Sequence, residues 1–243
     1  MKAVLLAAGR GTRLGELSEH TPKPMLKIAG RPVIEHNLRW LAEHGVTEVV
    51  INLHHLGDAI ESYVGSGHAF GLHVHYHREP ELLGTAGALK PFETFLSSGP
   101  FLVVYGDNLF DFDLSKLIDE HANNTGVATL ALFDPAIHPN TGVAGGRVEM
   151  DRAGRVIRFV EGREDVGLRL VNAGCYVVEP SLLPHIPKDE PMDFGHDLFP
   201  LVLRNQGILG GHLIDGWCLG LDTPAALARA RRFCEQKTLE DHA

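Results

Sequence analysis

The chain contains few cysteines and lacks the patterns that use them for metal binding or disulfide formation. Three of its 243 residues are cysteine, at positions 175, 218 and 234, and no two form a C-x-x-C pair. An odd number of widely spaced thiols gives poor support to a disulfide framework or a metal–thiolate site. The fifteen histidines show no H-E-x-x-H or similar spacing, so we expect surface or core roles for them rather than zinc binding.

The sequence also lacks long apolar runs and an excess of positive charge. No apolar stretch approaches the roughly 20 residues that a membrane-spanning helix needs. The first residues already form an apolar run with no charged segment before it, so we expect no signal peptide and a cytoplasmic location. A formal charge of −9 argues against nucleic acid or a membrane surface as a partner, because both select basic faces. Association into a homo-oligomer is left open.

Two common phosphate-binding motifs are missing as well. Nothing in the chain supplies the Gly-x-x-x-x-Gly-Lys-Ser/Thr pattern of P-loop proteins. The dinucleotide fingerprint Gly-x-Gly-x-x-Gly is also absent, because Gly15 comes one residue late and Arg13 stands inside the loop. A hydride-transfer cofactor is therefore not expected.

The N-terminus carries a different glycine loop. The apolar run 3–7 predicts a buried strand, and Gly9 and Gly11 follow it at once. Glycines let main-chain N–H groups come close to an anion, as larger residues usually do not. Two cations follow, Arg13 and the proline-flanked Lys23. This stretch predicts an anion-binding loop; the alternative is a simple strand-to-helix turn with two solvated cations.

The remaining chain alternates between strands and helices. Apolar periodicity predicts strands over 48–53, 72–77, 101–105 and 127–133, with helices over 34–41, 56–64, 89–96 and 114–124. Such alternation predicts an α/β fold with three layers and a mostly parallel central sheet. The second half is less helical, with strands expected over 143–150, 155–160, 171–178 and 208–214 and helices over 199–203 and from Thr223-Pro224. We expect one domain spanning 1–243.

The run Gly9-Arg-Gly-Thr-Arg13, followed by Pro22-Lys-Pro24, resembles the signature of the nucleotidyltransferases that join an NTP to a sugar 1-phosphate. The resemblance covers nearly the whole chain, without the left-handed β-helix that some relatives append. It implies a Rossmann-like fold, an NTP and a sugar 1-phosphate as substrates, and Mg²⁺. The NTP would bind to 1–125 and the sugar phosphate to 126–243. Arg13 would hold the departing β/γ-phosphates and Lys23 the α-phosphate and the acceptor region. Leu6, Ala8, Gly9, Gly11 and Thr12 would surround the nucleotide.

The segment Leu83-Gly-Thr-Ala-Gly87 is expected at the base of the nucleotide. Its small residues would let a flat base lie against the main chain. The resemblance implies nucleotide contacts from Gly84, Thr85 and Gly87 and from Glu79 a few positions earlier. Similar segments are common in guanylyltransferases that act on mannose- or heptose-type phosphates, which favours GTP. The alternative for Thr85 is a helix N-cap.

Two aspartates are the expected Mg²⁺ ligands. Asp107 follows a predicted central strand and matches the family's metal-binding aspartate, and Mg²⁺ is commonly held by one or two carboxylates beside substrate phosphates. Relatives usually carry Asp-Ile-Gly-Thr-Pro before the last helix, where this chain has Gly220-Leu-Asp222-Thr-Pro224. The carboxylate has moved by two residues, and two residues along a strand return a side chain to the same face. The alternative for Asp222 is a position at the helix N-terminus, with Asp215 as the next candidate ligand.

The acceptor pocket is expected from two further segments. Phe159-Val-Glu161 and Val171-Asn-Ala-Gly174 resemble the family's sugar-phosphate pocket, with Glu161 and Asn172 on sugar hydroxyls and Gly174 in its floor. Relatives carry a lysine on the acceptor phosphate after that glutamate, whereas this chain has Gly162. The full expected set is Gly142, Glu161, Arg163, Asn172 and Gly174, in which Arg163 would replace the lysine.

Two other functions stay open at this point. One is cytidylyl transfer to a non-sugar phosphate or phosphonate, which the missing lysine and the altered Leu-Asp-Thr run allow. The other is a nucleotide-sensing module without turnover. Such a module would be expected to lose Arg13, Lys23 or Asp107, and all three are present.

Overall fold

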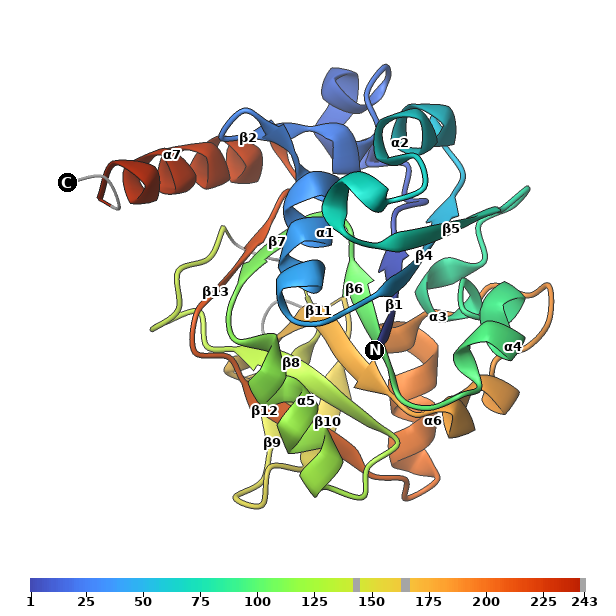
Figure 1. Cartoon of the computed structure of the whole chain (residues 1–243). Coiled ribbons are helices and arrows are strands. Elements are labelled where there is room, and N and C mark those ends of the chain that lie inside the picture. The colour runs from blue at the N-terminus through green and yellow to red at the C-terminus, as the bar shows by residue number, and fades with distance from the viewer. Residues whose placement is uncertain (142–144, 163–166, 241–243) are drawn as a thin grey trace.

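A nine-stranded sheet forms the centre of the protein, in a computed structural model that describes residues 1–141, 145–162 and 167–240. Its main path runs β10-β9-β11-β6-β1-β4-β5, and β8 joins β11 and carries β12 (Figure 1). The strands are β1 (Lys2–Leu6), β4 (Glu48–Leu53), β5 (His73–Arg78), β6 (Phe101–Tyr105), β8 (Ala128–Phe133), β9 (Arg147–Met150), β10 (Val156–Val160), β11 (Leu170–Val178) and β12 (Leu209–Leu213).

Most strands of this sheet point the same way. β1 pairs in parallel with β4 and β6, β4 with β5, and β12 with β8. β11 runs antiparallel to β6, β8 and β9, and β10 runs antiparallel to β9. Among the described strands of this sheet, β10 and β11 therefore oppose the common direction, and the expected mostly parallel sheet is confirmed.

Helices cover both faces of the sheet, because alternate strand residues point to opposite sides. Ala3 and Leu5 of β1 pack into one core cluster, and Val4 packs into another. The first cluster includes apolar residues of α1 (Val33–Glu43), α2 (Gly57–Val64) and α5 (Leu114–Asn123). The second includes residues of α3 (Gly84–Gly87), α4 (Glu93–Leu96) and α6 (Phe199–Arg204). The three-layer α/β/α arrangement is confirmed.

The helix expected over 89–96 is wrong as one continuous element. The structure has the short α3 before it, a 3₁₀ turn over Lys90–Phe92 and then α4. Pro91 has no N–H to donate and fixes its own backbone angle, which suits a tight turn better than a helix interior.

The described part of the chain contains no helix with the length and apolar character that a membrane span requires.

Two small antiparallel sheets lie outside the main one. β2 (Lys27–Ile28) pairs with β3 (Arg31–Pro32), and β7 (Asn108–Asp111) pairs with β13 (Trp217–Gly220). α7 (Pro224–Glu240) follows β13 and projects from the body in Figure 1. Thr223 caps α7 as expected, because its Oγ1 accepts a hydrogen bond from Ala226 N at 3.1 Å.

Candidate active site

Two adjoining cavities open beyond the carboxyl ends of the parallel strands, where ligands bind in open α/β sheets. The β1-side cavity measures about 250 Å³ and is lined by Leu6, Ala8 and Gly9. The β11-side cavity measures about 300 Å³ and is lined by Glu161 and Asn172 among others. Both are lined by Thr85, Tyr105, Asp107 and Asp193, so the two cavities share one wall.

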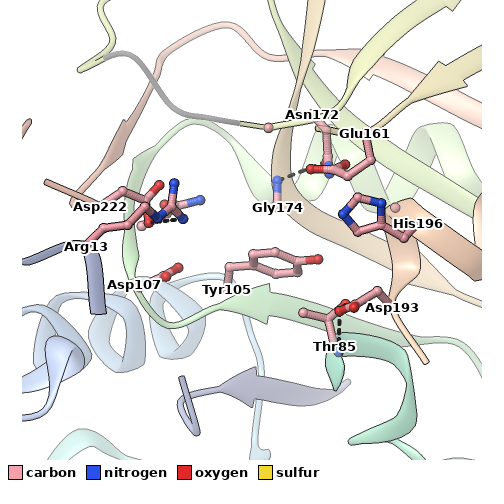
Figure 2. Close-up of a pocket in the computed structure, with 13 residues that line it drawn as sticks. Arg13, Thr85, Tyr105, Asp107, Glu161, Asn172, Gly174, Asp193, His196 and Asp222 are labelled. Carbon is pink, nitrogen blue, oxygen red and sulfur yellow. Dashed lines mark hydrogen bonds and ion pairs between the residues drawn. The ribbon is translucent and has the colours of Figure 1, made fainter. Parts of the chain in front are cut away.

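An ion-pair cluster lies where the cavities meet. The Nζ atom of Lys23 donates to Asp107 Oδ2 at 2.6 Å and to Asp222 Oδ1 at 2.5 Å. Arg13 Nη2 donates to the same oxygen of Asp222 at 3.0 Å (Figure 2). Burial lowers the pKa of Lys23, but the two carboxylates raise it more, so the net pKa lies above its ordinary value of 10.5. The lysine is therefore a fixed positive charge at the junction.

The pairing of β7 with β13 explains why the two aspartates meet. Its antiparallel register sets Asn108 opposite Gly220. Asp107 directly precedes β7, and Asp222 follows β13 by two residues, at the same end of the pair. The structure is consistent with the prediction that the Asp222 carboxylate reaches the site despite its shift of two residues. Thr223, and not Asp222, caps α7.

The donor set of this cluster fits Mg²⁺ better than a softer metal. It offers two carboxylates and no thiolate or imidazole, and Mg²⁺ is usually held by one or two carboxylates plus substrate phosphates. No group of three or more histidine, cysteine, aspartate or glutamate residues gathers as a metal site in the described part of the chain. Asp215, the next candidate ligand, instead accepts from Lys116 Nζ and from Asp113 N.

The glycine loop leaves open space where a ligand would lie. A Cβ added to Gly9 would meet no described atom within 4 Å, and Gly9 lines the β1-side cavity. Gly11 has a φ of +63°, and its carbonyl accepts from Leu14 N and Ser18 Oγ, both at 2.9 Å. Gly11 is thus needed by the turn itself. Thr12 lies at a separate hollow with Arg10, outside both cavities.

Glu79 is held by hydrogen bonds at the end of the β1-side cavity. Its Oε1 accepts from Asn52 Nδ2 at 2.8 Å, and its Oε2 accepts from Leu83 N at 3.0 Å. Asn52 Oδ1 in turn accepts from Ala7 N at 2.7 Å. These bonds fix the carboxylate between the ends of β1, β4 and β5, with both Asn52 and Glu79 in the cavity lining.

The glycines of the Leu83–Gly87 segment have a role that the sequence did not predict. A Cβ on Gly84 would lie 2.6 Å from Met192 O, and Gly84 has a φ of +74°. A Cβ on Gly87 would lie 3.3 Å from Glu190 O and 3.4 Å from Met192 N. Gly84 still lines the β1-side cavity, whereas buried Gly87 faces the 190–192 main chain instead of a cavity wall. Gly87 therefore lines neither cavity, and its expected contact with the base stays a prediction.

Thr85 joins this segment to the same distant loop. Its N and Oγ1 both donate to Asp193 Oδ1, at 3.0 and 2.9 Å, and its Oγ1 accepts from Phe194 N at 2.9 Å. Thr85 is therefore not a helix N-cap: the residue before α3 is Leu83, and no side-chain bond caps that helix. The Thr85–Asp193 pair forms part of the shared wall in Figure 2.

Glu161 lies in the β11-side cavity, and the pKa of its carboxyl is raised. Burial raises the pKa of Glu161 above 4.5, and Asp193 also raises it, whereas His196 and a hydrogen bond from Gly146 lower it. A Cβ on Gly146 or Gly195 would come within 2.5 Å or 2.3 Å of Glu161 Oε2. Two glycines therefore make the room that this carboxyl occupies.

The β11 residues also reach this cavity. Asn172 Nδ2 donates to Tyr176 Oη at 2.7 Å, and Asn172 Oδ1 accepts from Gly174 N at 3.0 Å. Gly174 has a φ of +77°, and a Cβ there would lie 2.9 Å from the Tyr105 ring. Gly142 and Arg163 of the expected acceptor set lie outside the described residues.

Several lining residues were not found from the sequence. Asn52 follows the same strand-end rule as Asp107 and could have been found by it. Tyr105 occupies the last position of β6, but its aromatic side chain gave no chemical signal. Others come from loops and the π-helical turn Phe194–Leu198, where no periodicity marks them, among them Gly145, Asp193, Gly195 and His196.

The chain is similar to known proteins over most of its length. A family model described as "Nucleotidyl transferase" matches residues 2–235. A UTP–glucose-1-phosphate uridylyltransferase of Synechocystis sp. is 34% identical over 82% of this chain and 54% of its own length. A mannose-1-phosphate guanylyltransferase of Mycobacterium tuberculosis is 35% identical over 84% of this chain and 55% of its own. This chain therefore spans about half the length of these two curated relatives.

The fold is shared with solved structures. A putative glucose-1-phosphate thymidylyltransferase from Bacillus anthracis, solved with a sucrose, aligns with a TM-score of 0.84. The alignment covers 96% of this chain and 95% of that chain at 24% sequence identity, which shows a common fold. Because the family match runs over almost the whole chain and the relatives exceed 30% identity, this protein belongs to the nucleotidyl transferase family.

Proposed function

We propose that this protein transfers a nucleotidyl group from an NTP, with GTP favoured, to a sugar 1-phosphate and releases pyrophosphate. The observation that supports this most is the position of the Lys23 cluster between two cavities. The β1-side cavity has the glycine loop, and the β11-side cavity has polar groups suited to a hydroxylated acceptor. A reaction between two bound substrates needs a charged centre at their junction, and Lys23 with Arg13, Asp107 and Asp222 lies there.

The transfer requires the protein mainly to position the two substrates and to neutralise their charge. An oxygen of the acceptor phosphate attacks the α-phosphorus, a new P–O bond forms, and the bond to the β-phosphate oxygen breaks to release pyrophosphate. Lys23 would bind the α-phosphate and the approaching acceptor phosphate, and Arg13 would bind the leaving β/γ-phosphates. Main-chain N–H groups from Gly9 to Thr12 would hold the phosphate chain. Because the protein would hold both substrates in line, the transfer step would become effectively unimolecular.

Asp107 and Asp222 would hold Mg²⁺. Mg²⁺ held by these two residues would supply positive charge against the negative charge that develops on the phosphates. Asp107 is 34% exposed and Asp222 16% exposed, so both have oxygens that a phosphate-bound cation can reach. The two aspartates would keep their oxygens oriented through the Lys23 and Arg13 contacts until the nucleotide enters.

Glu79 supports GTP as the favoured nucleotide. Its side-chain oxygens already accept hydrogen bonds from Asn52 Nδ2 and Leu83 N, and such oxygens suit a base that presents donors. Guanine presents N1–H and N2–H₂ side by side as donors, whereas uracil presents one N–H and cytosine one amino group. The guanylyltransferase relative is consistent with GTP, and the uridylyltransferase relative makes UTP the alternative that any test must include.

The acceptor would bind in the β11-side cavity. Glu161, Asn172 and the backbone around Gly174 would contact sugar hydroxyls. Arg163, which lies outside the described residues, would replace the lysine that relatives place on the acceptor phosphate.

A pyrophosphate-release screen tests the proposal. The four NTPs are combined with mannose, glucose, heptose and N-acetylated sugar 1-phosphates, and with phosphocholine as a non-sugar acceptor. GTP with a sugar 1-phosphate should give the highest rate, and Lys23→Ala should give almost none. Turnover only with CTP and phosphocholine would replace the proposed function by cytidylyl transfer. Nucleotide binding without turnover on any acceptor would favour a sensing module.

A further inference from the structure

The loop after β1 is anchored at two points on either side of its first glycine. Ala7 N donates to Asn52 Oδ1 at 2.7 Å. Three residues later, the guanidinium of Arg10 reaches the ring of His54, with Nη2 and Nε2 3.4 Å apart. Gly9 lies between these anchors, and a Cβ added to it would meet no described atom within 4 Å. The path of the loop at Gly9 therefore depends on what holds it at either end.

Both anchors end on Glu79. Asn52 Nδ2 donates to the Glu79 carboxylate at 2.8 Å, and His54 Nδ1 lies 2.8 Å from the Glu79 main-chain oxygen. Asn52 and His54 flank Leu53, the last residue of β4. One anchor thus runs through the side chain of Glu79 and the other through its backbone. The glycine loop and the Glu79 carboxylate, which is proposed to face the base, therefore belong to one hydrogen-bond network.

The partners of His54 determine which ring nitrogen carries the proton. A main-chain carbonyl only accepts, so Nδ1 must be the donor to Glu79 O. A guanidinium only donates, so Nε2 must accept from Arg10. The ring therefore has a single tautomer with both nitrogens used. A side chain that joins these two groups must carry both a donor and an acceptor, which excludes an aromatic ring without nitrogens.

His54 lies away from the reacting atoms. It lines neither of the two cavities and faces the separate hollow of about 500 Å³ beside Arg10 and Thr12. We infer that His54 is a positioning residue, which holds the glycine loop through Arg10 so that its N–H groups meet the β- and γ-phosphates of the bound NTP. This inference rests on the proposed function, because it concerns how the same site holds its nucleotide.

The experiment compares triphosphates with monophosphates by isothermal titration calorimetry. GTP, UTP, GMP and UMP are titrated into the wild type, His54→Phe and His54→Gln. A monophosphate fills the base end and lacks the β- and γ-phosphates that the loop would hold. His44→Phe is the matched control, because His44 also bonds a main-chain carbonyl, that of Trp40 at 2.8 Å, and lines neither cavity.

His54→Phe should weaken binding of the preferred triphosphate about tenfold and change monophosphate binding by less than about twofold. His54→Gln, whose Oε1 can accept from Arg10, should recover part of the loss. His44→Phe should match the wild type. Equal weakening of mono- and triphosphate, or unchanged triphosphate binding, would overturn the inference.

A double-mutant cycle with Arg10→Met tests whether the two residues act together. If His54 works through Arg10, the double variant should bind the triphosphate about as weakly as the worse single variant. Fully additive losses would overturn the inference, and this cycle can use His54→Gln should His54→Phe fail to fold. A wild type that binds neither GTP nor UTP would overturn the proposed function itself, which separates that failure from a failure of the His54 role.

Discussion

Replacing Lys23 with methionine should destabilise the free protein and make its stability respond to Mg²⁺ alone. Lys23 is 6% exposed and its ammonium lies within 2.6 Å of both Asp107 and Asp222. In the free protein this ammonium occupies the position between the carboxylates that a cation would use. The wild type should therefore bind free Mg²⁺ weakly, and Lys23→Met should bind it better because its internal competitor is gone.

The size of the effect follows from burial. Removing one partner of a fully buried ion pair costs about 3–5 kcal/mol. Asp107 is 34% exposed, which lets water screen its charge, and Arg13 still contacts Asp222. We therefore expect a loss of about 2 kcal/mol, or a Tm lower by roughly 4–8 °C for a chain of this length. Turnover should fall by about 10²–10³ because a fixed cation for the transition state is lost.

Differential scanning fluorimetry in EDTA and in Mg²⁺, without nucleotide, measures both effects. Mg²⁺ should raise the Tm of Lys23→Met and leave the wild type almost unchanged. Lys27→Met, at an exposed position, is the control and should behave as the wild type does. The pKa of Lys23 is raised, so its stabilising charge is fully present below pH 10.5 and is lost only at higher pH. The Tm difference should thus be constant over the neutral range. A variant with no Mg²⁺ response would refute the assignment of this carboxylate pair as the metal site.

Four further substitutions separate binding roles from structural ones. Glu161→Gln should raise the Tm at neutral pH, because the raised pKa of Glu161 means that its ionised form is unfavourable once pH exceeds 4.5, and should weaken acceptor binding in calorimetry. Asp222→Asn should leave α7 intact by circular dichroism, since Thr223 provides the cap, and should increase the Mg²⁺ concentration needed for turnover. Gly9→Ala should change stability by at most about 0.5 kcal/mol and weaken NTP binding, whereas Gly84→Ala should lower the Tm because of its φ of +74°.

Much of the parallel part of the fold could be predicted because each strand is a short apolar run between turn residues. The runs at 48–53 and 101–105 match β4 and β6 to the residue. Strand direction in the second half could not be predicted, because alternation is the same in parallel and antiparallel strands. The insertion of β11 between β6 and β9, against the common direction, depends on long-range pairing that leaves no local pattern.

The charged centre was predictable for a different reason. Lys23, Asp107 and Asp222 stand beside glycine, proline or strand-end signals that mark loops at the site edge. Their mutual contacts were not predictable, because the pairing of β7 with β13 joins segments that are more than a hundred residues apart. The sequence therefore indicated that Lys23, Asp107 and Asp222 are site candidates. It did not indicate that Lys23 lies between the two aspartates.

Glycines show most clearly where sequence reasoning ends. Gly9 and Gly87 look alike in the sequence, each in a small-residue segment after a strand, and the sequence predicts a nucleotide contact for both. In the structure the open side of Gly9 faces a cavity, while Gly87 lies against the main chain of Glu190 and Met192. At Gly9 the missing side chain leaves room for a ligand. At Gly87 it leaves room for the loop that contains Glu190 and Met192, from the other half of the chain. The residue after this loop segment is Asp193, which bonds Thr85 in the wall that both cavities share, so the close packing at Gly84 and Gly87 lies directly beside that wall.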